Sequence, residues 1–446
     1  MSFGRVEVPQ LTSTPAEATR RPIVYDVTRI VTRALNAAPN GIDRVDFALA
    51  RHFLARSDRE RGALICTAIG PRLADPDRAL ETIGGVENLW REDGDAEHDD
   101  VYRTVVAALR SNGLAQSSTA RAKKPINLSF LEQNWRAMRR WAPHLGRSLR
   151  EAPHGAVYFN ATQFLVDRSW YVRWLTARPD VKPVFFVHDL LPIESPEFFR
   201  AREAMLHPRR MINICRYGAG AVVGSQTVAR RLRHFAAECG RPELPICVAR
   251  LPVSAVFASS AAPPAELEGV NYFVVCGTIE PRKNHLTLLN AWRALAQESA
   301  PPKLVIVGKR GWLNAAVIEL LERSVALRPH VIEAGGLSTP GLRRLLAGAR
   351  ALLMPSCAEG FGLPVAEALA AGTPVIASDI EAFREVGGDA IDYVDPFDGH
   401  GWLQAVRDYS ASQSRRRRAA LGRIGGGDAT KVDTFVSQID DFIARL

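Results

Sequence analysis

The sequence predicts an α/β protein with two doubly wound parallel sheets that face each other. Short apolar runs alternate with helical stretches over residues 22–255, and the same pattern repeats from residue 271 to about residue 400. Strands that alternate with helices along a chain usually form a parallel sheet with helices on its faces. The chain has 446 residues, more than a single hydrophobic core usually holds, so we expect two domains of about 200 residues each.

Each predicted strand is a short apolar run bounded by polar or turn-forming residues. In the first half these runs are Ile23–Tyr25, Ala63–Cys66, Ala156–Phe159, Val184–Val187 and Gly220–Val223. In the second half they lie near residues 272–276, 303–307, 330–334, 350–354 and 374–377. A small, proline-containing segment separates the halves, which predicts an N-terminal domain of residues 1–258, a linker of 259–270 and a C-terminal domain of 271–430.

The segment Pro355–Glu367 carries the strongest functional signal. Its two carboxylates, Glu359 and Glu367, stand eight positions apart across a glycine-rich turn, which follows an apolar strand and opens a helix at Pro364. Taken singly, Glu367 is explained by compensation of the helix dipole and Glu359 by a solvated loop. As a pair in this context, they indicate a site that can hold a nucleotide sugar at both ends.

The backbone of the same turn favours the same kind of ligand. The N–H groups around Gly360, Gly362 and Leu363 would lie at a helix start, where they have no partner within the helix. Together with the helix dipole, such groups attract an anion or a hydroxyl-rich molecule.

A second signature, Gly277–Asn284, follows the predicted strand Asn271–Cys276. Asn284 is expected to cap the next helix. Arg282 and Lys283 would lie at the carboxyl end of the strand, where open α/β sheets bind their ligands. A basic pair before a helix is more commonly surface charge, but its position opposite the first signature favours function.

Together with Val307–Trp312, these two signatures resemble those of the retaining glycosyltransferases of family 4, including bacterial mannosyltransferases. The resemblance covers roughly residues 271–398 and is weaker before them. It implies the GT-B fold, in which two Rossmann-like domains enclose a cleft, the first binding the acceptor and the second the nucleotide-sugar donor. It also implies that residues 431–446 form a helix that packs back towards the N-terminal domain.

The resemblance assigns roles to the residues of both signatures. Glu367 would hold the ribose hydroxyls of the donor, Glu359 the hydroxyls of the transferred sugar, and Arg282 with Lys283 the diphosphate. Many relatives carry a basic residue where this chain has Thr278, so neutralisation of the phosphates depends more on Arg282 and Lys283. The donor-binding set is completed by Gly277, Thr278, Gly360, Phe361, Gly362 and Leu363.

Three places in the N-terminal half are candidates for chemistry. His188 follows an apolar strand; a lone histidine there is more commonly structural, but enzymes resembling this chain place one beside the sugar, and we carry that role to His188. Gly41 and Arg44, between the first strand and a helix, would contact the diphosphate or the acceptor, although the glycine also serves simply as a turn residue. Ser225 is best explained as a helix cap.

Composition narrows the class of protein and its surroundings. The six cysteines lack metal-ligand spacing and read as reduced core residues of a cytoplasmic protein. We expect no metal, because Asp75-Pro-Asp77 and Asp93-Gly-Asp95 lie in loop-like sequence that only imitates an Asp-x-Asp site. The chain shows neither a signal peptide nor an apolar run long enough to cross a membrane.

A net charge of +9 indicates an acidic partner but does not identify it. Residues 121–150 mix tryptophans with arginines, which suits the anionic inner face of a membrane or a helix packed on its own domain with its arginines in water. Nucleic acid is not expected, because the basic residues are scattered through an α/β pattern.

The sequence therefore predicts an enzyme that transfers a hexose from a nucleoside diphosphate sugar to a glycan or lipid-linked acceptor. GDP-mannose is the first donor suggested by the resemblance and a UDP-hexose the second, within bacterial surface polysaccharide synthesis. Two alternatives are a nucleotide-sugar 2-epimerase, which would need no acceptor, and a polyanion-binding protein without enzymatic activity.

Overall fold

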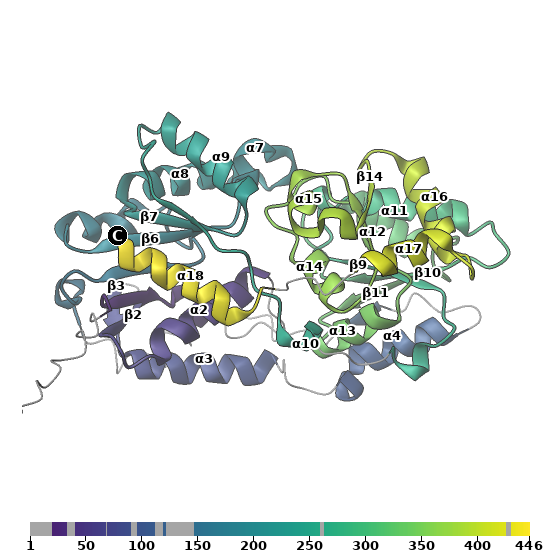
Figure 1. Cartoon of the computed structure of the whole chain (residues 1–446), viewed down its shortest axis with the longest axis horizontal. Coiled ribbons are helices and arrows are strands. Elements are labelled where there is room, and N and C mark those ends of the chain that lie inside the picture. The colour runs from purple at the N-terminus through teal and green to yellow at the C-terminus, as the bar shows by residue number, and fades with distance from the viewer. Residues whose placement is uncertain are drawn as a thin grey trace, which may run out of the picture.

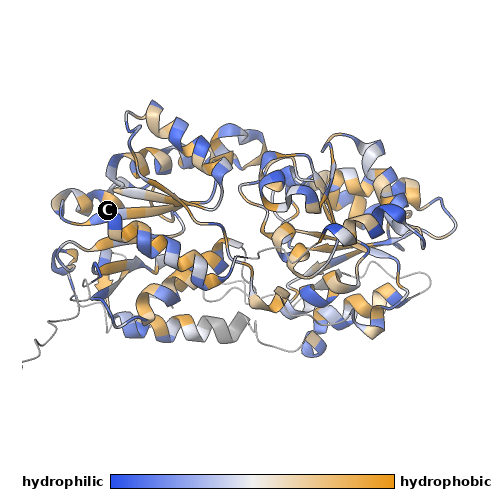
Figure 2. Cartoon of the chain, viewed as in Figure 1, coloured by the Kyte–Doolittle hydropathy of each residue, from blue (hydrophilic) through white to orange (hydrophobic). Residues whose placement is uncertain are grey.

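The computed structural model describes residues 20–33, 41–67, 69–90, 96–111, 119–121, 147–258, 263–424 and 430–446. These residues form two halves that lie side by side, each built on a seven-stranded sheet with helices packed against it (Figure 1). The strands are mainly apolar, whereas the helices expose polar residues on their outer faces (Figure 2). Burial of both faces of each sheet explains the continuous apolar runs in the sequence.

The first sheet has the strand order β3-β2-β1-β5-β6-β7-β8 and is parallel except for its β2–β3 pair. That pair is antiparallel because only two residues separate the strands, too few for a crossover. The unexpected edge strand does not alter the doubly wound core. The strands are β1 (Ile23–Asp26), β2 (Arg61–Thr67), β3 (Gly70–Ala74), β5 (Val157–Asn160), β6 (Lys182–Val187), β7 (Gly220–Val223) and β8 (Ile246–Val248).

The second sheet has the order β14-β13-β12-β9-β10-β11-β4, and all of its pairs are parallel. Its central strands are those that the apolar runs predict. Their bounds are β4 (Thr119–Arg121), β9 (Tyr272–Cys276), β10 (Lys303–Val307), β11 (Val331–Gly335), β12 (Leu352–Met354), β13 (Val375–Ser378) and β14 (Asp392–Val394).

The helices cover the two sheets with amphipathic faces. Before residue 259 they are α1 (Thr28–Arg33), α2 (Gly41–Ala55), α3 (Pro76–Trp90), α4 (Asp100–Arg110), α6 (Ser169–Val172), α7 (Leu191–Glu194), α8 (Ala201–Tyr217), α9 (Gln226–Glu238) and α10 (Ala255–Ala258). After it they are α11 (His285–Leu295), α12 (Ala315–Arg323), α13 (Thr339–Gly348), α14 (Leu363–Ala370), α15 (Glu381–Gly387), α16 (Gly399–Ser410), α17 (Arg415–Arg423) and α18 (Val432–Arg445). Short 3₁₀ helices are η1 (Ala96–His98), η3 (Leu149–Glu151), η4 (Arg173–Ala177), η5 (Pro196–Phe198), η6 (Ala265–Leu267), η7 (Pro281–Lys283) and η8 (Gly388–Ala390).

One segment of the first half packs on the second sheet. Strand β4 pairs in parallel with β11, and α4 lies beside that edge (Figure 1). The Lys303 ammonium donates hydrogen bonds to the carbonyls of Ala108, Leu109 and Ser111, where α4 ends. The expected division into residues 1–258 and 271–430 therefore does not describe η1, α4 and β4. A three-residue strand that pairs with one more than 200 positions away leaves no local sequence signal.

The last helix runs the other way, from the second half to the first. The rings of Phe435 in α18 and Phe186 in β6 lie 6.3 Å apart, and the Asp440 carboxylate accepts a hydrogen bond from Arg59 at 2.7 Å. Helix α18 thus lies along the first domain (Figure 1). Residues 259–262 of the expected linker, and 122–146 of the basic segment, lie outside the described residues.

Candidate active site

Glu359 lies in the loop between β12 and α14 at the centre of a buried ion cluster. One oxygen of its carboxylate accepts hydrogen bonds from the Lys283 ammonium and, at 2.9 Å, from the Ser356 hydroxyl. The other oxygen accepts a hydrogen bond from the Arg282 guanidinium at 2.6 Å. Arg282 also pairs with Glu280 at 2.6 Å. The two sequence signatures therefore meet in space.

The charges of this cluster fix the ionisation of Glu359. Burial alone would raise the pKa of the carboxyl, but the positive charges of Arg282 and Lys283 outweigh burial and lower that pKa to about 2. Glu359 is therefore a carboxylate at neutral pH and acts purely as a hydrogen-bond acceptor. Such a group suits the hydroxyls of a sugar.

The loop after β9 places Lys283 beside Glu359. Gly277 has φ +146°, and a Cβ atom there would lie 3.2 Å from Cε of Lys283, so glycine lets the lysine side chain pass close to the backbone. The chain then turns through η7, and the carbonyl of Arg282 accepts a hydrogen bond from the Cys357 amide at 2.7 Å. Thr278 has its methyl group against Gly311.

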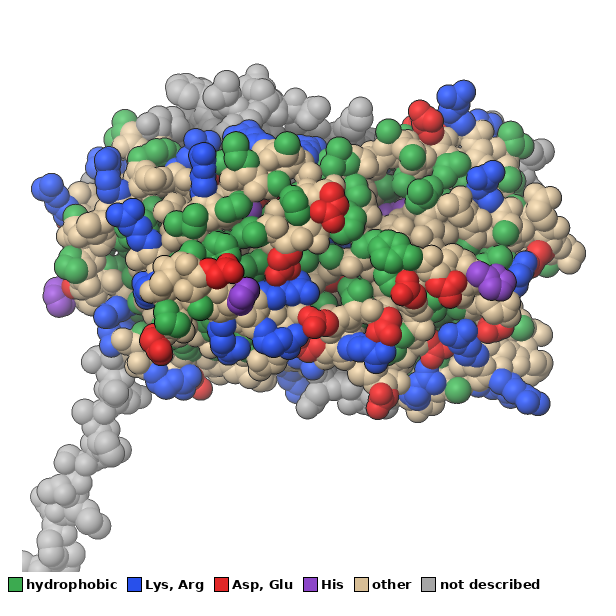
Figure 3. Space-filling model, turned by 90° about the horizontal axis from the view of Figure 1, so that it is seen from above, with side chains coloured by type: hydrophobic (Ala, Val, Ile, Leu, Met, Phe, Trp, Pro, Cys, Tyr) green, Lys and Arg blue, Asp and Glu red, His purple; other side chains and the backbone are tan. Residues whose placement is uncertain are grey.

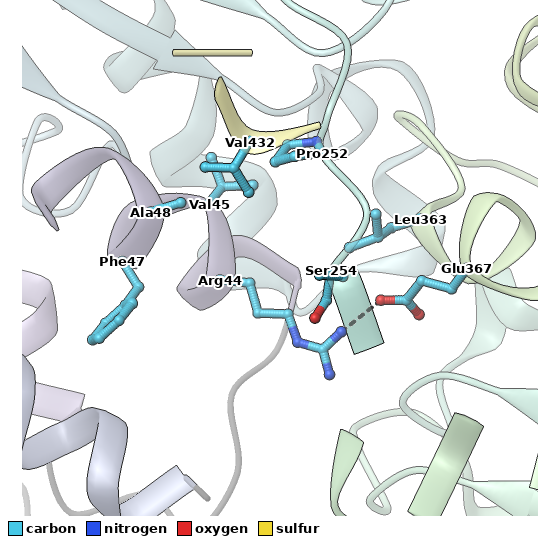
Figure 4. A pocket seen from close by; sticks show the side chains of 10 residues that line it. Arg44, Val45, Phe47, Ala48, Pro252, Ser254, Leu363, Glu367 and Val432 are labelled. Atoms are coloured by element: carbon cyan, nitrogen blue, oxygen red, sulfur yellow. Dashed lines mark hydrogen bonds and ion pairs between the residues drawn. The ribbon is translucent and has the colours of Figure 1, made fainter. Parts of the chain in front are cut away.

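Glu367 lies on α14, whose start is set by Gly362 at φ +101° and by Pro364 in the first turn. Its buried carboxylate accepts a hydrogen bond at 2.5 Å from Arg44, which lies on α2 in the first half (Figure 4). Arg44 also donates to the Thr339 hydroxyl at 2.9 Å. The structure thus joins Glu367 to Arg44 across the two halves, whereas Glu359 pairs within the second half.

A pocket of about 160 Å³ lies beside this interdomain ion pair. Figure 4 shows the side chains of Arg44 and Glu367 pointing toward each other, with the dashed line between their charged groups. Gly41 lies near the same wall, because a Cβ atom at that position would be 3.7 Å from Cδ2 of Leu363. The lining residues are Arg44, Val45, Phe47, Ala48, Pro252, Ser254, Ala255, Leu363, Glu367 and Val432.

His188 follows β6 and lies where the first half meets the Glu359 loop. Its Nε2–H donates to the carbonyl of Ala161 at 2.8 Å, which leaves Nδ1 of the neutral ring as an acceptor. Burial lowers the pKa of His188 to about 4, so the ring is neutral at physiological pH. A Cβ atom at Gly360 would lie 2.6 Å from the carbonyl oxygen of His188, so glycine allows this contact between the halves.

The remaining residues of the glycine-rich turn, Phe361 and Gly362, pack against neighbouring elements. Phe361 is buried, and a Cβ atom at Gly362 would lie 2.8 Å from the ring of Phe383 on α15. The turn is therefore wedged between α15 and the end of β6.

Sequence reasoning missed several polar and charged residues of this region. Glu280 and Ser356 join the Glu359 cluster, and their only signal was their position inside the two signatures. Arg29 and Asp43 form an ion pair at 3.0 Å, and their charges act on His188. No local motif marks this pair, because α1 and α2 bring it together.

Among the described residues, no group of three His, Cys, Asp or Glu side chains forms a candidate metal site. Asp75 accepts hydrogen bonds from the amides of Asp77 and Arg78 at the start of α3, and Asp93 and Asp95 lie outside the described ranges. In the part of the chain that is described, no helix has the length and apolar character needed to cross a bilayer.

Comparison with known proteins finds a family match in the second half. Residues 259–420 match the model of the family "Glycosyl transferases group 1". The matched region contains Glu359, Glu367, Arg282 and Lys283, so the charged residues of both signatures lie in the part of the chain that is similar to this family.

Curated relatives are bacterial enzymes. The serotype-specific mannosyltransferase WbdA of Escherichia coli is 30% identical over 215 residues, 45% of this chain and 26% of the relative. The O-antigen chain mannosyltransferase B of Escherichia coli is 37% identical over 134 residues, 30% of this chain and 35% of the relative. The chain thus spans about a quarter to a third of the length of these curated relatives.

A solved structure shares the whole fold. HepE from Anabaena, in complex with UDP and glucose, aligns with 96% of this chain and 100% of its own, with a TM-score of 0.58 and 15% sequence identity. This likeness confirms the predicted GT-B fold of two facing Rossmann-like domains.

Proposed function

We propose that this protein is a retaining hexosyltransferase that moves mannose from GDP-mannose to a hydroxyl group of a glycan or lipid-linked acceptor. The observation that carries the proposal is the buried cluster of Glu359, Arg282 and Lys283 inside a glycosyl transferases group 1 domain. Relatives named as mannosyltransferases support the sugar. A UDP-hexose is the second donor, because HepE was solved with UDP and glucose.

In this reaction Arg282 and Lys283 bind the diphosphate of the donor. A guanidinium has five hydrogen-bond donors and an ammonium three, so both can bind Glu359 and a phosphate oxygen together. As the bond between the anomeric carbon and the diphosphate breaks, the electron pair leaves with the diphosphate. The two cations and the amides at the start of α14 stabilise that charge in a water-poor cleft.

Glu359, which is ionised, accepts hydrogen bonds from hydroxyls of the transferred sugar, and Glu367 accepts them from the ribose. His188, which is neutral, orients a sugar hydroxyl through Nδ1. The acceptor oxygen attacks the anomeric carbon from the face that the diphosphate leaves, and the acceptor proton passes to an oxygen of the departing phosphate. This route retains the configuration without a protein nucleophile.

Donor binding requires a rearrangement around Arg44. The pocket of about 160 Å³ is smaller than the roughly 300–1,000 Å³ of sites that bind drug-sized ligands. Arg44 also forms an ion pair with the Glu367 carboxylate, the group proposed to hold the ribose. We therefore place Arg44 and Gly41 at the diphosphate: when the donor enters, Arg44 releases Glu367 to the ribose and turns to a phosphate oxygen, while Gly41 leaves room for that movement.

The acceptor and the cellular setting follow from the same relatives. One of them is named as an O-antigen chain mannosyltransferase, so we assign this protein to bacterial surface polysaccharide synthesis, on the cytoplasmic side of the membrane that anchors a lipid-linked acceptor. Contact with an anionic membrane surface through residues 121–150 belongs to the same proposal.

Thermal-shift measurements with GDP, UDP, ADP and their hexose derivatives test the donor. A ligand that binds only the folded protein stabilises it by about 2.7 kcal/mol at a hundred times its Kd. We expect GDP and GDP-mannose to raise the Tm most, and Lys283→Ala to abolish the rise. Arg293→Ala, an exposed site on α11, is the matched control.

Product analysis then separates transfer from epimerisation. With GDP-mannose and a mannan oligosaccharide acceptor, a transferase lengthens the acceptor and releases GDP. An epimerised donor formed without any acceptor would identify a 2-epimerase instead. A protein that no nucleotide stabilises, but that binds polyanions in a salt-dependent manner, would contradict enzymatic function.

A further inference from the structure

Glu385 on α15 reaches across the domain interface to the start of α9. One oxygen of its carboxylate accepts a hydrogen bond from the Gln226 amide at 2.6 Å. The other accepts hydrogen bonds from the amide and the hydroxyl of Thr227, at 3.0 and 2.9 Å. Three hydrogen bonds therefore join one side chain of the second domain to one helix end of the first.

The start of α9 is suited to hold this carboxylate. The first amides of a helix have no partner within the helix, and the helix dipole favours a negative charge at that end. Ser225, which caps α9, accepts a hydrogen bond from the Val228 amide at 3.2 Å. Glu385 satisfies the two amides that Ser225 does not reach, and it does so from the opposite domain.

The same helix start touches the loop that carries Glu359. The hydroxyl of Ser225, which is fully buried, donates to the carbonyl of Gly360 at 2.9 Å. Gly360 lies against the carbonyl of His188, as described above. Ser225 and Gly360 thus connect the helix start that Glu385 binds to the contact between the Glu359 loop and His188.

A neighbouring bond strengthens this contact region. Arg250, in the segment that leads out of the first domain, donates to the carbonyl of Val386 at 2.9 Å. Figure 1 shows α9 and α15 facing each other on the upper side of the molecule, and Figure 3 views that side, where charged side chains of both signs lie along the middle.

We propose that Glu385 is a positioning residue that fastens the two domains at α9 and so holds the Glu359 loop against His188. It touches neither the donor nor the acceptor, and it acts through Ser225 and Gly360. This inference rests on the proposed function, since it concerns the geometry of transfer. Most of the proposed donor contacts lie in the second domain, so donor affinity falls little without Glu385, whereas the sugar and His188 lose their relative placement.

Steady-state kinetics of Glu385→Ala and Glu385→Gln test this role. A displacement of about 1 Å in a reacting centre can cost about a hundredfold in rate. We expect kcat to fall between about tenfold and a hundredfold in Glu385→Ala, less in Glu385→Gln, and the Kd for the donor to stay within about threefold. The matched control is Glu381→Gln on the same helix, because Glu381 pairs with Arg230 at 3.1 Å and is 60% exposed.

The design separates positioning from general stability. Thr227→Val removes one of the three bonds, and its effect on kcat should largely disappear in the double variant with Glu385→Ala. An unchanged kcat in Glu385→Ala, or a parallel loss of kcat and donor affinity, would overturn the inference.

A wild-type protein without transfer activity would contradict the proposed function rather than this contact. In that case small-angle scattering tests whether Glu385 fastens the domains. The inference predicts a larger radius of gyration for Glu385→Ala than for the wild type and Glu381→Gln. Equal radii would overturn it.

Discussion

The two sides of the candidate site are built in different ways. Glu359, Arg282 and Lys283 come from two short segments of the second domain and pair with one another. The first domain supplies Arg44 and His188 from separate elements, and these reach the second domain through a long-range ion pair and a backbone contact. The side that the second domain supplies, the donor side, is therefore complete within one domain, whereas the contribution of Arg44 and His188 to the same site exists only while the domains stay together.

The largest effect is expected when the charge at the centre of the donor side is removed. We expect Glu359→Gln to lower kcat for transfer by about 10²–10³, because the sugar loses a charged acceptor and Lys283 loses its counter-ion. Transfer to an oligosaccharide acceptor, followed by chromatography, measures the effect.

The control for this variant is Glu319→Gln on α12, an exposed glutamate far along the chain from both signatures. It should retain wild-type kcat. A Glu359→Gln enzyme with more than half of the wild-type rate would show that the cluster has only a structural role.

The donor side could be predicted because its chemistry is local in sequence. A strand, a glycine-rich turn and a helix start follow each other within about twenty residues, and the carboxyl ends of neighbouring parallel strands meet at one edge. Strand β9 is the neighbour of β12, which brings Lys283 to Glu359. Asn284 is the N-cap residue of α11, as expected, but its side chain makes no capping bond: the residue has φ +52°, and its side-chain amide donates to the carbonyl of Pro396.

The interdomain contacts could not be predicted, because they depend on how two domains dock. Glu385 and the amide of Thr227 are 158 positions apart, and β4 and β11 are separated by more than 200. Ser225 illustrates the limit: its capping role could be inferred from sequence, whereas its bond to Gly360 could not. Only tertiary structure shows that one helix start serves both purposes.

The pH dependence of stability tests His188, on the side of the site that the first domain supplies. Burial lowers the pKa of His188 to about 4, below the value near 6.5 of an unfolded histidine. Between these values the unfolded chain binds a proton that the folded protein does not. The stabilisation is therefore present above pH 6.5 and is lost as the pH falls towards 4. It changes by at most about 2 kcal/mol between pH 7 and 5.

His188→Gln should therefore show a smaller fall in Tm between pH 7 and 5 than the wild type, in differential scanning calorimetry. The buried acid Asp46, whose pKa burial raises to about 8, acts in the opposite direction in both proteins and cancels in the difference. His154→Gln, at an exposed site, should behave like the wild type. An identical fall in Tm for His188→Gln would mean that His188 titrates as it does in the unfolded chain.

The smallest effect on transfer is expected where the first half is fastened to the second away from the site. The three hydrogen bonds of Lys303 hold the end of α4 beside the outer strands of the second sheet, and burial lowers the pKa of this lysine. Lys303→Met keeps the aliphatic stem but leaves three carbonyls without this cation, which should cost about 2 kcal/mol of stability. Calorimetry should show a lower Tm, with Lys431→Met as the exposed control.

The transfer rate of the folded variant should equal that of the wild type, because the domains remain joined at Glu385. A large loss of kcat would instead mean that α4 and β4 help to shape the cleft. Both sides of the site would then depend on segments of the first half.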